Sequence, residues 1–183
     1  MVATALYNYK RYLDGDKSAL DELVRTLSDS ITRYAYCYLN DAATAEDVME
    51  ETFATLIVKR RHFKDDQHLC AYLYRVARNK SIDYLRWRGK QIPLEDVEEI
   101  LSHNELEASV MAQERNRLIY TCMQQLPRQY REILYLNYFD GFTIVEICHI
   151  LNKNTKQVYN LLSRAKAALK EIFLKEGITY EDL

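Results

Sequence analysis

Glycine and proline are scarce in this chain, which has four glycines and two prolines among 183 residues. Folds built from many short strands need such residues in clusters at strand spacing, and no such clusters occur. The shortage argues against a sheet-based fold and predicts an all-α protein. At this length a core can be buried without disulfides or metals, and we expect two small helical domains.

Long apolar segments are also missing. No stretch approaches the apolar length that spans a bilayer, and the amino terminus has no basic region followed by an apolar one. We therefore expect a cytoplasmic protein.

Patterns that carry covalent or metal chemistry are absent too. Cys37, Cys70, Cys122 and Cys148 are scattered without a close pair, so neither a disulfide framework nor a zinc site is indicated, although His149 follows Cys148. We interpret the cysteines as reduced packing residues. A Ser–His–Asp or Cys–His arrangement and a glycine-rich phosphate loop are also lacking. These absences predict a protein with no catalytic residues, metal, cofactor or small-molecule substrate.

The net charge of −2 hides a strong asymmetry. Residues 59–90 contain ten basic and three acidic side chains, whereas residues 95–114 contain seven acidic side chains and no Lys or Arg. A chain of this kind can offer nucleic acid a basic face while its total charge stays near zero.

Amphipathic periodicity predicts helices in the first half of the chain. Two lie in residues 1–40, separated by Gly15, and their many tyrosines favour packing with the hydroxyl at the surface over stacking on bases. Thr44 is predicted to cap a third helix over residues 45–60. Its outward side is acidic, at Glu46, Asp47, Glu50 and Glu51. Taken alone, this patch is explained by solvation and by the helix dipole.

A polar loop over residues 60–68 is predicted to precede a helix over residues 69–88. This helix interleaves basic residues with Tyr72, Tyr74, Tyr84 and Trp87, a combination that suits phosphates and unstacked bases. The alternative is a simply solvated basic helix. Gly89 is predicted to stop it.

The next part of the chain reads as an acidic linker that ends near residue 106. A polar helix is predicted from Glu107 to Leu126, and Pro127 takes the first position of the helix after it. Residues 143–170 then read as a helix-turn-helix. Thr143 with Glu146, and Asn154 with Gln157, have capping-box spacing, and the second helix is sized for the major groove. An ordinary helical bundle is the alternative.

Three segments in order resemble a known family: AEDVMEETF, then AYLYRVARNKSIDYLR, then LPRQYREILYLNYFDGFTIVEICHILN followed by VYNLLSRAKAAL. The chain is identified by them as similar to the extracytoplasmic-function (ECF) sigma factors of bacterial RNA polymerase, over residues 20–169. The resemblance implies sigma region 2 in residues 1–90, a flexible acidic linker in residues 91–106, and a helix-turn-helix region 4 in residues 107–183.

The resemblance also implies three sets of functional residues. The set for binding the polymerase core is Glu46, Asp47, Glu50 and Glu51. The set for the −10 element, with a pocket for a flipped base at Phe63, Lys64 and Asn79, is Phe63, Lys64, Arg75, Arg78, Asn79, Arg86 and Arg88. The set for the −35 element is Thr155, Lys156, Tyr159, Asn160, Ser163, Arg164 and Lys166. The implied partners are the polymerase core, promoter DNA and an anti-sigma factor.

The chain departs from the family pattern in the second helix of the helix-turn-helix. Tyr159 and Asn160 stand where a basic and a small polar residue are usual, and Lys156 and Asn152 stand where glycines are common. We expect fewer phosphate contacts there and a specificity that depends on Tyr159 and Asn160. Two alternatives stay open from the sequence: a homodimeric helix-turn-helix regulator that does not act as a sigma subunit, and a helical adaptor that binds only proteins.

Overall fold

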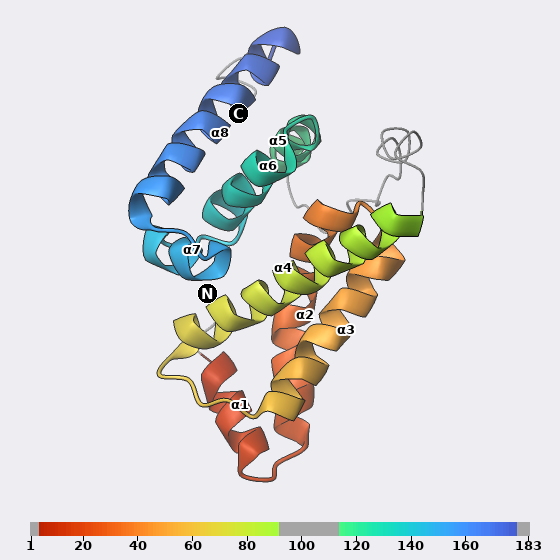
Figure 1. Ribbon diagram of the computed structural model, residues 1–183. Helices are drawn as coiled ribbons and strands as arrows, with labels where there is room; N and C mark the ends of the chain where they lie inside the picture. The colour runs from red at the N-terminus through yellow and green to blue at the C-terminus, as the bar shows by residue number, and fades with distance from the viewer. Residues whose placement is uncertain (1–3, 92–113, 179–183) are drawn as a thin grey trace. The chain divides into compact units, whose positions relative to one another are not determined.

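The computed structural model describes residues 4–91 and 114–178, which are helical and contain no strand (Figure 1). They divide into two compact units. One holds helices α1 to α4, and the other holds α5, α6, α8 and the first residues of α7. The all-α prediction is confirmed for these residues. The predicted acidic linker and the start of the helix from Glu107 lie outside them.

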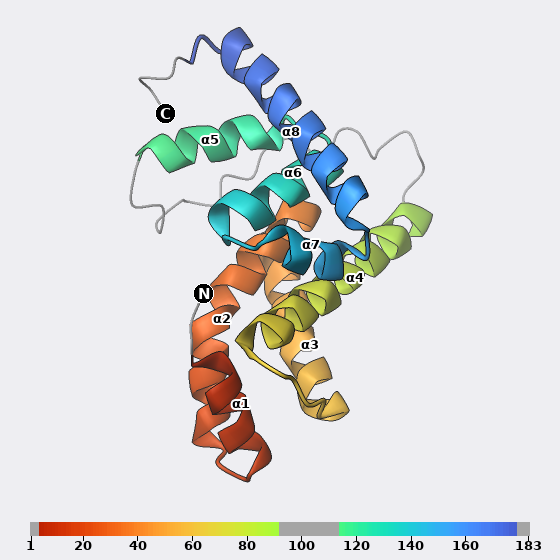
Figure 2. The ribbon, with the colours of Figure 1, turned by 90° about the vertical axis from the view of Figure 1, so that its left-hand side faces the viewer.

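The first unit is organised around its second helix. It consists of α1 (Ala5–Leu13), α2 (Ser18–Leu39), α3 (Ala42–Lys59) and α4 (Asp66–Gln91). Helix α2 packs against each of the other three, and α4 also contacts α1 and α3. The core contains fully buried Leu23, Ile31, Leu56, Leu69 and Leu73. Figures 1 and 2 show the loop between α3 and α4 passing beside α1.

Helix α3 begins earlier than predicted. Its cap is Asp41, whose Oδ1 accepts a hydrogen bond from the Thr44 N–H at 2.7 Å, so Thr44 already lies inside the helix. The prediction that Thr44 caps the helix is wrong, because the helix starts three residues earlier, where the Asp41 carboxylate accepts from one of the first N–H groups. Asn40 takes a left-handed conformation, φ +50°, and ends α2.

Helix α4 is longer than predicted at both ends. It starts at Asp66 rather than residue 69, after Asp65, whose Oδ1 accepts from the His68 N–H at 2.9 Å. It also continues through Gly89, which the sequence predicted as the stop, to Gln91. A glycine in a helix interior costs only about 1 kcal/mol relative to alanine, and Gly89 does not have a positive φ. The glycine therefore permits a helix end without enforcing one.

The second unit contains short helices around one long one. They are α5 (Glu114–Gln124), α6 (Arg128–Leu134), the π-helical segment η3 (Tyr135–Phe139), α8 (Thr155–Lys175) and residues 144–148 of α7 (Ile144–Leu151). Helix α8 packs against α6 and α5, and a short turn joins α7 to α8 (Figure 2). Val158, Leu162, Ala165 and Leu169 form the buried side of α8.

Both predicted capping boxes are present. The Thr143 N–H donates to Glu146 Oε2 at 2.6 Å, and the Glu146 N–H points back to the Thr143 hydroxyl at 3.4 Å. The Asn154 side chain accepts from the Gln157 N–H at 2.9 Å, and the Gln157 side chain accepts from the Asn154 N–H at 3.0 Å. The prediction that Pro127 takes the first position of the next helix is wrong by one residue. Pro127 precedes the first position of α6 and is its N-cap residue.

The tyrosines pack more deeply than expected. Tyr9 and Tyr34 are fully buried, and Tyr36 and Tyr38 are nearly so, whereas Tyr7 is exposed. All four cysteines are free thiols, as predicted. Three are buried, and burial raises the pKa of the Cys122 thiol above its ordinary value. In the described ranges, no helix is long and apolar enough to cross a membrane, and no cluster of three or more His, Cys, Asp or Glu residues suited to a metal ion occurs.

Candidate functional site

The first candidate surface is the acidic side of α3. Burial of Ala45, Val48 and Leu56 turns the opposite side of this helix outward. The four predicted residues are all exposed there: Glu46, Asp47, Glu50 and Glu51. Glu51 is partly engaged within the fold, because its Oε2 lies 2.7 Å from the Lys80 Nζ of α4. The structure thus brings the four carboxylates onto one helix side, with one of them paired.

The second candidate surface includes the α3–α4 loop, residues 60–65. The Phe63 ring is half-buried, and its centre lies 5.2 Å from that of Tyr72 on α4. The Arg61 guanidinium lies 5.4 Å from the centre of the same Tyr72 ring. Lys64 is exposed beside them. Phe63 therefore packs into the fold, while Lys64 and Arg61 present positive charge at the loop.

The outward side of α4 continues this basic surface. Arg75, Asn79 and Arg86 are exposed, and Arg78 and Arg88 are half-buried. Towards the end of the helix, Arg86 pairs with Asp83 at 3.3 Å on the surface.

The predicted base pocket is not assembled as one contact cluster. Asn79 follows Tyr72 by two helical turns, which places it about 10 Å further along the axis. Phe63 contacts Tyr72 itself. The structure consequently places Phe63 and Lys64 together and Asn79 apart from them, on the same side of α4.

An aromatic pair, the exposed Trp87 and the half-buried Tyr84, lies near the end of α4. Trp87 is 55% exposed, and its ring centre lies 6.0 Å from that of Tyr84. The Tyr84 hydroxyl accepts a long hydrogen bond of 3.4 Å from the Thr44 hydroxyl on α3. Aromatic faces of this kind, next to arginines, are suited to stack on unpaired bases.

Two residues that the sequence analysis did not single out, Asp66 and Tyr9, make contacts between α1 and the region where the α3–α4 loop enters α4. Asp66 Oδ1 accepts a hydrogen bond from the Leu6 N–H of α1 at 2.8 Å, and Tyr9 of α1 lies 5.7 Å from the Phe63 ring. The only sequence signal was that two carboxylates, Asp65 and Asp66, stand side by side at the start of α4, although one carboxylate is enough to cap a helix.

The third candidate surface is the outward side of α8. Lys156, Tyr159, Asn160, Ser163 and Arg164 are exposed and follow one another at helical spacing. Asn160 and Arg164 also line a shallow groove together with Lys153, Gln157 and Leu161.

Two members of the predicted −35 set lie at the edges of this side. Thr155 is the first residue of α8, and its hydroxyl lies 3.9 Å from the Cys148 thiol of α7. The Lys166 ammonium lies 5.4 Å from the centre of the Tyr138 ring. The structure therefore groups the other five residues and sets Thr155 and Lys166 beside them.

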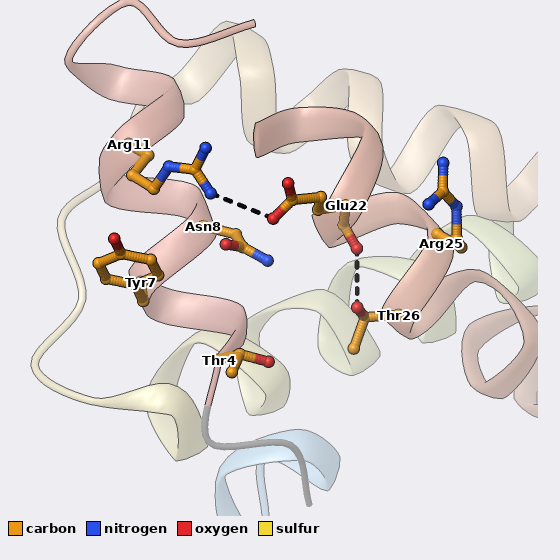
Figure 3. A pocket seen from close by; sticks show the side chains of 7 residues that line it. All are labelled: Thr4, Tyr7, Asn8, Arg11, Glu22, Arg25 and Thr26. Carbon is orange, nitrogen blue, oxygen red and sulfur yellow. Dashed lines mark hydrogen bonds and ion pairs between the residues drawn. The ribbon is translucent and has the colours of Figure 1, made fainter. Parts of the chain in front are cut away.

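A separate cleft of about 380 Å³ lies between α1 and α2 (Figure 3). Tyr7, Asn8 and Arg11 line it from α1, and Glu22, Arg25 and Thr26 line it from α2. Arg11 pairs with Glu22 at 3.1 Å and with Asp16 at 2.5 Å. The Arg11–Glu22 pair thus joins the two helices across the cleft.

Three aspartates of the first unit have lowered pKa values because hydrogen bonds favour their charged form. Thr44 lowers the pKa of Asp41, with a smaller electrostatic contribution from Arg88. His68 lowers that of Asp65, and Ser18 followed by Arg11 lowers that of Asp16. All three carboxylates lie at turns or helix starts, where they accept hydrogen bonds that stabilise the fold.

These surfaces are suited to binding rather than to covalent chemistry. The carboxylates of α3 fit a positively charged protein surface. The basic and aromatic side chains of α4 fit phosphates and unstacked bases. The polar side of α8 has the size and position of a recognition helix, which follows α7 after a short turn.

Comparisons with known proteins give two family matches in order along the chain. The family model of sigma-70 region 2 matches residues 23–91, and that of sigma-70 region 4 matches residues 116–169. Together they span more than half of the sequence. The first falls on α2 to α4, and the second runs from α5 into α8.

Curated relatives cover most of the chain. It is 28% identical over 155 residues to the ECF RNA polymerase sigma factor SigM of Bacillus subtilis, a match that spans 84% of this chain and 94% of SigM. It is 27% identical over 173 residues to SigW of the same organism, spanning 88% of this chain and 92% of SigW. The RNA polymerase sigma-H factor of Pseudomonas aeruginosa is 28% identical over 171 residues, spanning 87% and 89%.

Solved structures show the same fold. CnrH, solved in complex with the cytosolic domain of CnrY, aligns with a TM-score of 0.66 and 19% identity, over 93% of this chain and 97% of CnrH. The sigma factor RpoE of Bartonella quintana, solved with the anti-sigma factor NepR, aligns with a TM-score of 0.63 and 20% identity, over 84% and 95%.

Proposed function

Because the chain belongs to the sigma-70 family and to its extracytoplasmic-function group, we propose that it directs core RNA polymerase to specific promoters and helps to open them. The observation that carries this proposal is the order of the two family matches, region 2 at residues 23–91 and region 4 at residues 116–169, in one chain. The polymerase supplies the catalysis, and this chain supplies recognition. It acts in the cytoplasm, where the polymerase is.

We assign the parts of the chain to successive steps. Residues 1–90 act as region 2, residues 91–106 connect, and residues 107–183 act as region 4. Region 2 docks on the core through Glu46, Asp47 and Glu50, with Glu51 balanced by Lys80. The exposure of these carboxylates on one side of α3 supports the assignment, because docking needs charge that the fold itself does not neutralise.

The −10 element meets the α3–α4 loop and the outward side of α4. Lys64, Arg75 and Arg86 are exposed and suited to phosphates. Capture of an unpaired base offsets an unpairing cost of a few kcal/mol. Because Asn79 lies apart from Phe63, we assign the two residues to different nucleotides of the opened strand, with Phe63 shaping the loop from within.

The −35 element meets the outward side of α8. Lys156 and Arg164 supply positive charge, and Tyr159 and Asn160 occupy its centre. Asn160 carries both donors and acceptors, which is the chemistry that reads a base edge in the major groove. We assign base recognition mainly to these two residues, with Thr155 and Lys166 at the margins.

We further propose that an anti-sigma factor covers these surfaces when transcription is not required. The solved relative RpoE is bound to the anti-sigma factor NepR, which supports a partner of this class.

Binding to core polymerase tests the proposal against the two alternatives. The sigma assignment predicts a stable complex of the full chain with core polymerase in size-exclusion chromatography. Replacement of Asp47 and Glu50 by lysine should weaken it on the order of tenfold or more, because positive charge then faces a positive surface. The matched control replaces the exposed Asp21 and Asp29 of α2 by lysine and should bind like the wild type.

A chain that binds duplex DNA as a homodimer without forming this complex would contradict the proposal and favour a separate regulator. A holoenzyme without salt-dependent promoter binding would favour an adaptor that binds only proteins.

A further inference from the structure

Helix α1 is too short to be stable alone and depends on its contacts. It spans nine residues, Ala5–Leu13, whereas isolated helices below about 12 residues are marginal in water. Thr4 precedes it and provides no side-chain cap. The helix is therefore held in place by its contacts with other elements, which are α4, the α3–α4 loop and α2.

The first contact joins α1 to the start of α4. Asp66 Oδ1 accepts a hydrogen bond from the Leu6 N–H at 2.8 Å, across 60 residues of sequence. The first N–H groups of a helix have no partner inside the helix, and a carboxylate there also suits the positive end of the helix dipole. The first residue of α4 thus performs the capping that Thr4 does not.

The second contact joins α1 to the α3–α4 loop. The ring of Tyr9 is fully buried, and its centre lies 5.7 Å from that of Phe63. Phe63 in turn lies 5.2 Å from Tyr72 on α4. The loop is consequently held through one aromatic side chain between α1 and α4. Figures 1 and 2 both show it passing beside α1.

The third contact fixes α1 to α2. The Arg11 guanidinium pairs with Glu22 on α2 (Figure 3). It also pairs with Asp16 in the turn between the two helices. Helix α2 packs against α3 and α4 as well, so it forms the rigid centre of this unit. Helix α1 therefore connects that centre to the α3–α4 loop.

We propose that α1 positions the α3–α4 loop for the −10 element, and that Asp66 and Tyr9 are positioning residues for its recognition. The inference rests on the proposed function, because that function assigns the loop to the −10 element. A loop held in one conformation before it meets DNA loses less conformational entropy on binding than a mobile loop does. Tyr9 is buried, so it acts through Phe63 rather than through contact with DNA.

The test uses holoenzyme reconstituted from core polymerase and full-length variants, on a promoter from which the wild-type holoenzyme initiates. Asp66→Ala removes the acceptor and keeps a good helix former, whereas Asp66→Asn retains an acceptor oxygen. Tyr9→Leu removes the aromatic contact. Tyr9→Phe retains it and removes only a hydroxyl that has no hydrogen-bond partner within the described residues.

The measurement is the ratio of transcription from the native promoter to transcription from the same promoter with an altered −10 element. Fluorescence of 2-aminopurine in the −10 element reports unstacking directly. Loss of a hydrogen bond to a charged group corresponds to about a tenfold effect, so Asp66→Ala should lower both signals about tenfold. Tyr9→Leu loses an aromatic contact instead and should lower both signals about two- to tenfold. Asp66→Asn and Tyr9→Phe should stay near the wild type. Core affinity and discrimination at the −35 element should be unchanged.

Retention of −10 discrimination by both Asp66→Ala and Tyr9→Leu would overturn the inference. A parallel loss of core affinity and −35 discrimination would also overturn it, because that pattern means general destabilisation. If Asp66→Ala does not fold, Tyr9→Leu against Tyr9→Phe gives the same comparison. If the wild-type protein initiates at no promoter with core polymerase, the proposed function itself is contradicted. If the wild type initiates and only the variants fail to behave as expected, the positioning role of α1 alone is contradicted.

Discussion

Asp41 shows how one side chain sets the beginning of a functional helix. Its carboxylate accepts from the Thr44 N–H at 2.7 Å, and α3, which carries the acidic surface, starts immediately after it. Hydrogen bonds from the side chain of Thr44 and then from its backbone N–H lower the pKa of Asp41 below its ordinary value of 3.8. The position of the acidic surface along α3 thus depends on a residue outside that surface.

Asp41→Ala is expected to destabilise the protein by about 1 kcal/mol at neutral pH, the usual cost of losing an N-cap. Thr44→Ala should cost less, because the Asp41 carboxylate still accepts the hydrogen bond from the backbone N–H of residue 44. Urea unfolding followed by the fluorescence of Trp87, the one tryptophan of the chain, measures both. Equal destabilisation by the two variants would contradict the assignment of Asp41 as the cap.

The pH dependence follows from the lowered pKa of Asp41. The contribution of the charged carboxylate is present above the ordinary value of 3.8 and is lost as pH falls through the lower pKa of the folded state. Asp41→Asn keeps a good cap and cannot titrate, so it should match the wild type at pH 7 and lose less stability than the wild type in acid. An identical acid response of the two would refute this.

Among the helices, the sequence predicted well those features that depend on residues close together in the chain. The boxes at Thr143 with Glu146, and at Asn154 with Gln157, depend on residues three apart and were both found. The helix-turn-helix follows from such pairs and from apolar spacing. Its outward residues were predicted for the same reason, because burial of one side of α8 determines which side is exposed.

What the sequence did not predict depends on distant contacts. The cap of α1 comes from Asp66, which no local pattern connects to Leu6. The role of Phe63 was assigned from the family resemblance, which gave no sign that its ring is held by Tyr9 and Tyr72. Asn79 was grouped with Phe63 by family resemblance, and the rise of α4 separates them.

For α8, Arg164→Ala is expected to weaken binding of holoenzyme to the −35 element while leaving core affinity intact. The loss should be about 1–3 kcal/mol and specific to one base pair if Arg164 reads a base, and smaller and less selective if it contacts phosphate. Lys170→Ala, which removes an exposed charge further along α8, is the control. Equal loss of core and DNA binding would mean that Arg164 has a structural role instead.

In the whole molecule, acidic and basic side chains gather in different segments of the chain. The net charge therefore does not indicate which partners its surfaces bind. The acidic side of α3 and the basic side of α4 belong to one compact unit, linked by the pair of Glu51 and Lys80. The outward side of α8 belongs to the other unit. A net charge of −2 therefore coexists with two surfaces that we assign to DNA and one that we assign to the polymerase.

Transcription of genomic DNA by core polymerase, with and without the purified chain, tests the central claim most directly when the 5′ ends of the transcripts are sequenced. The sigma assignment predicts new starts that appear only with the chain and share two sequence elements, near −10 and −35. These starts should be lost when Asp47 and Glu50 are replaced by lysine. No new start at any promoter, with a chain that is folded and core polymerase that is active, would contradict it.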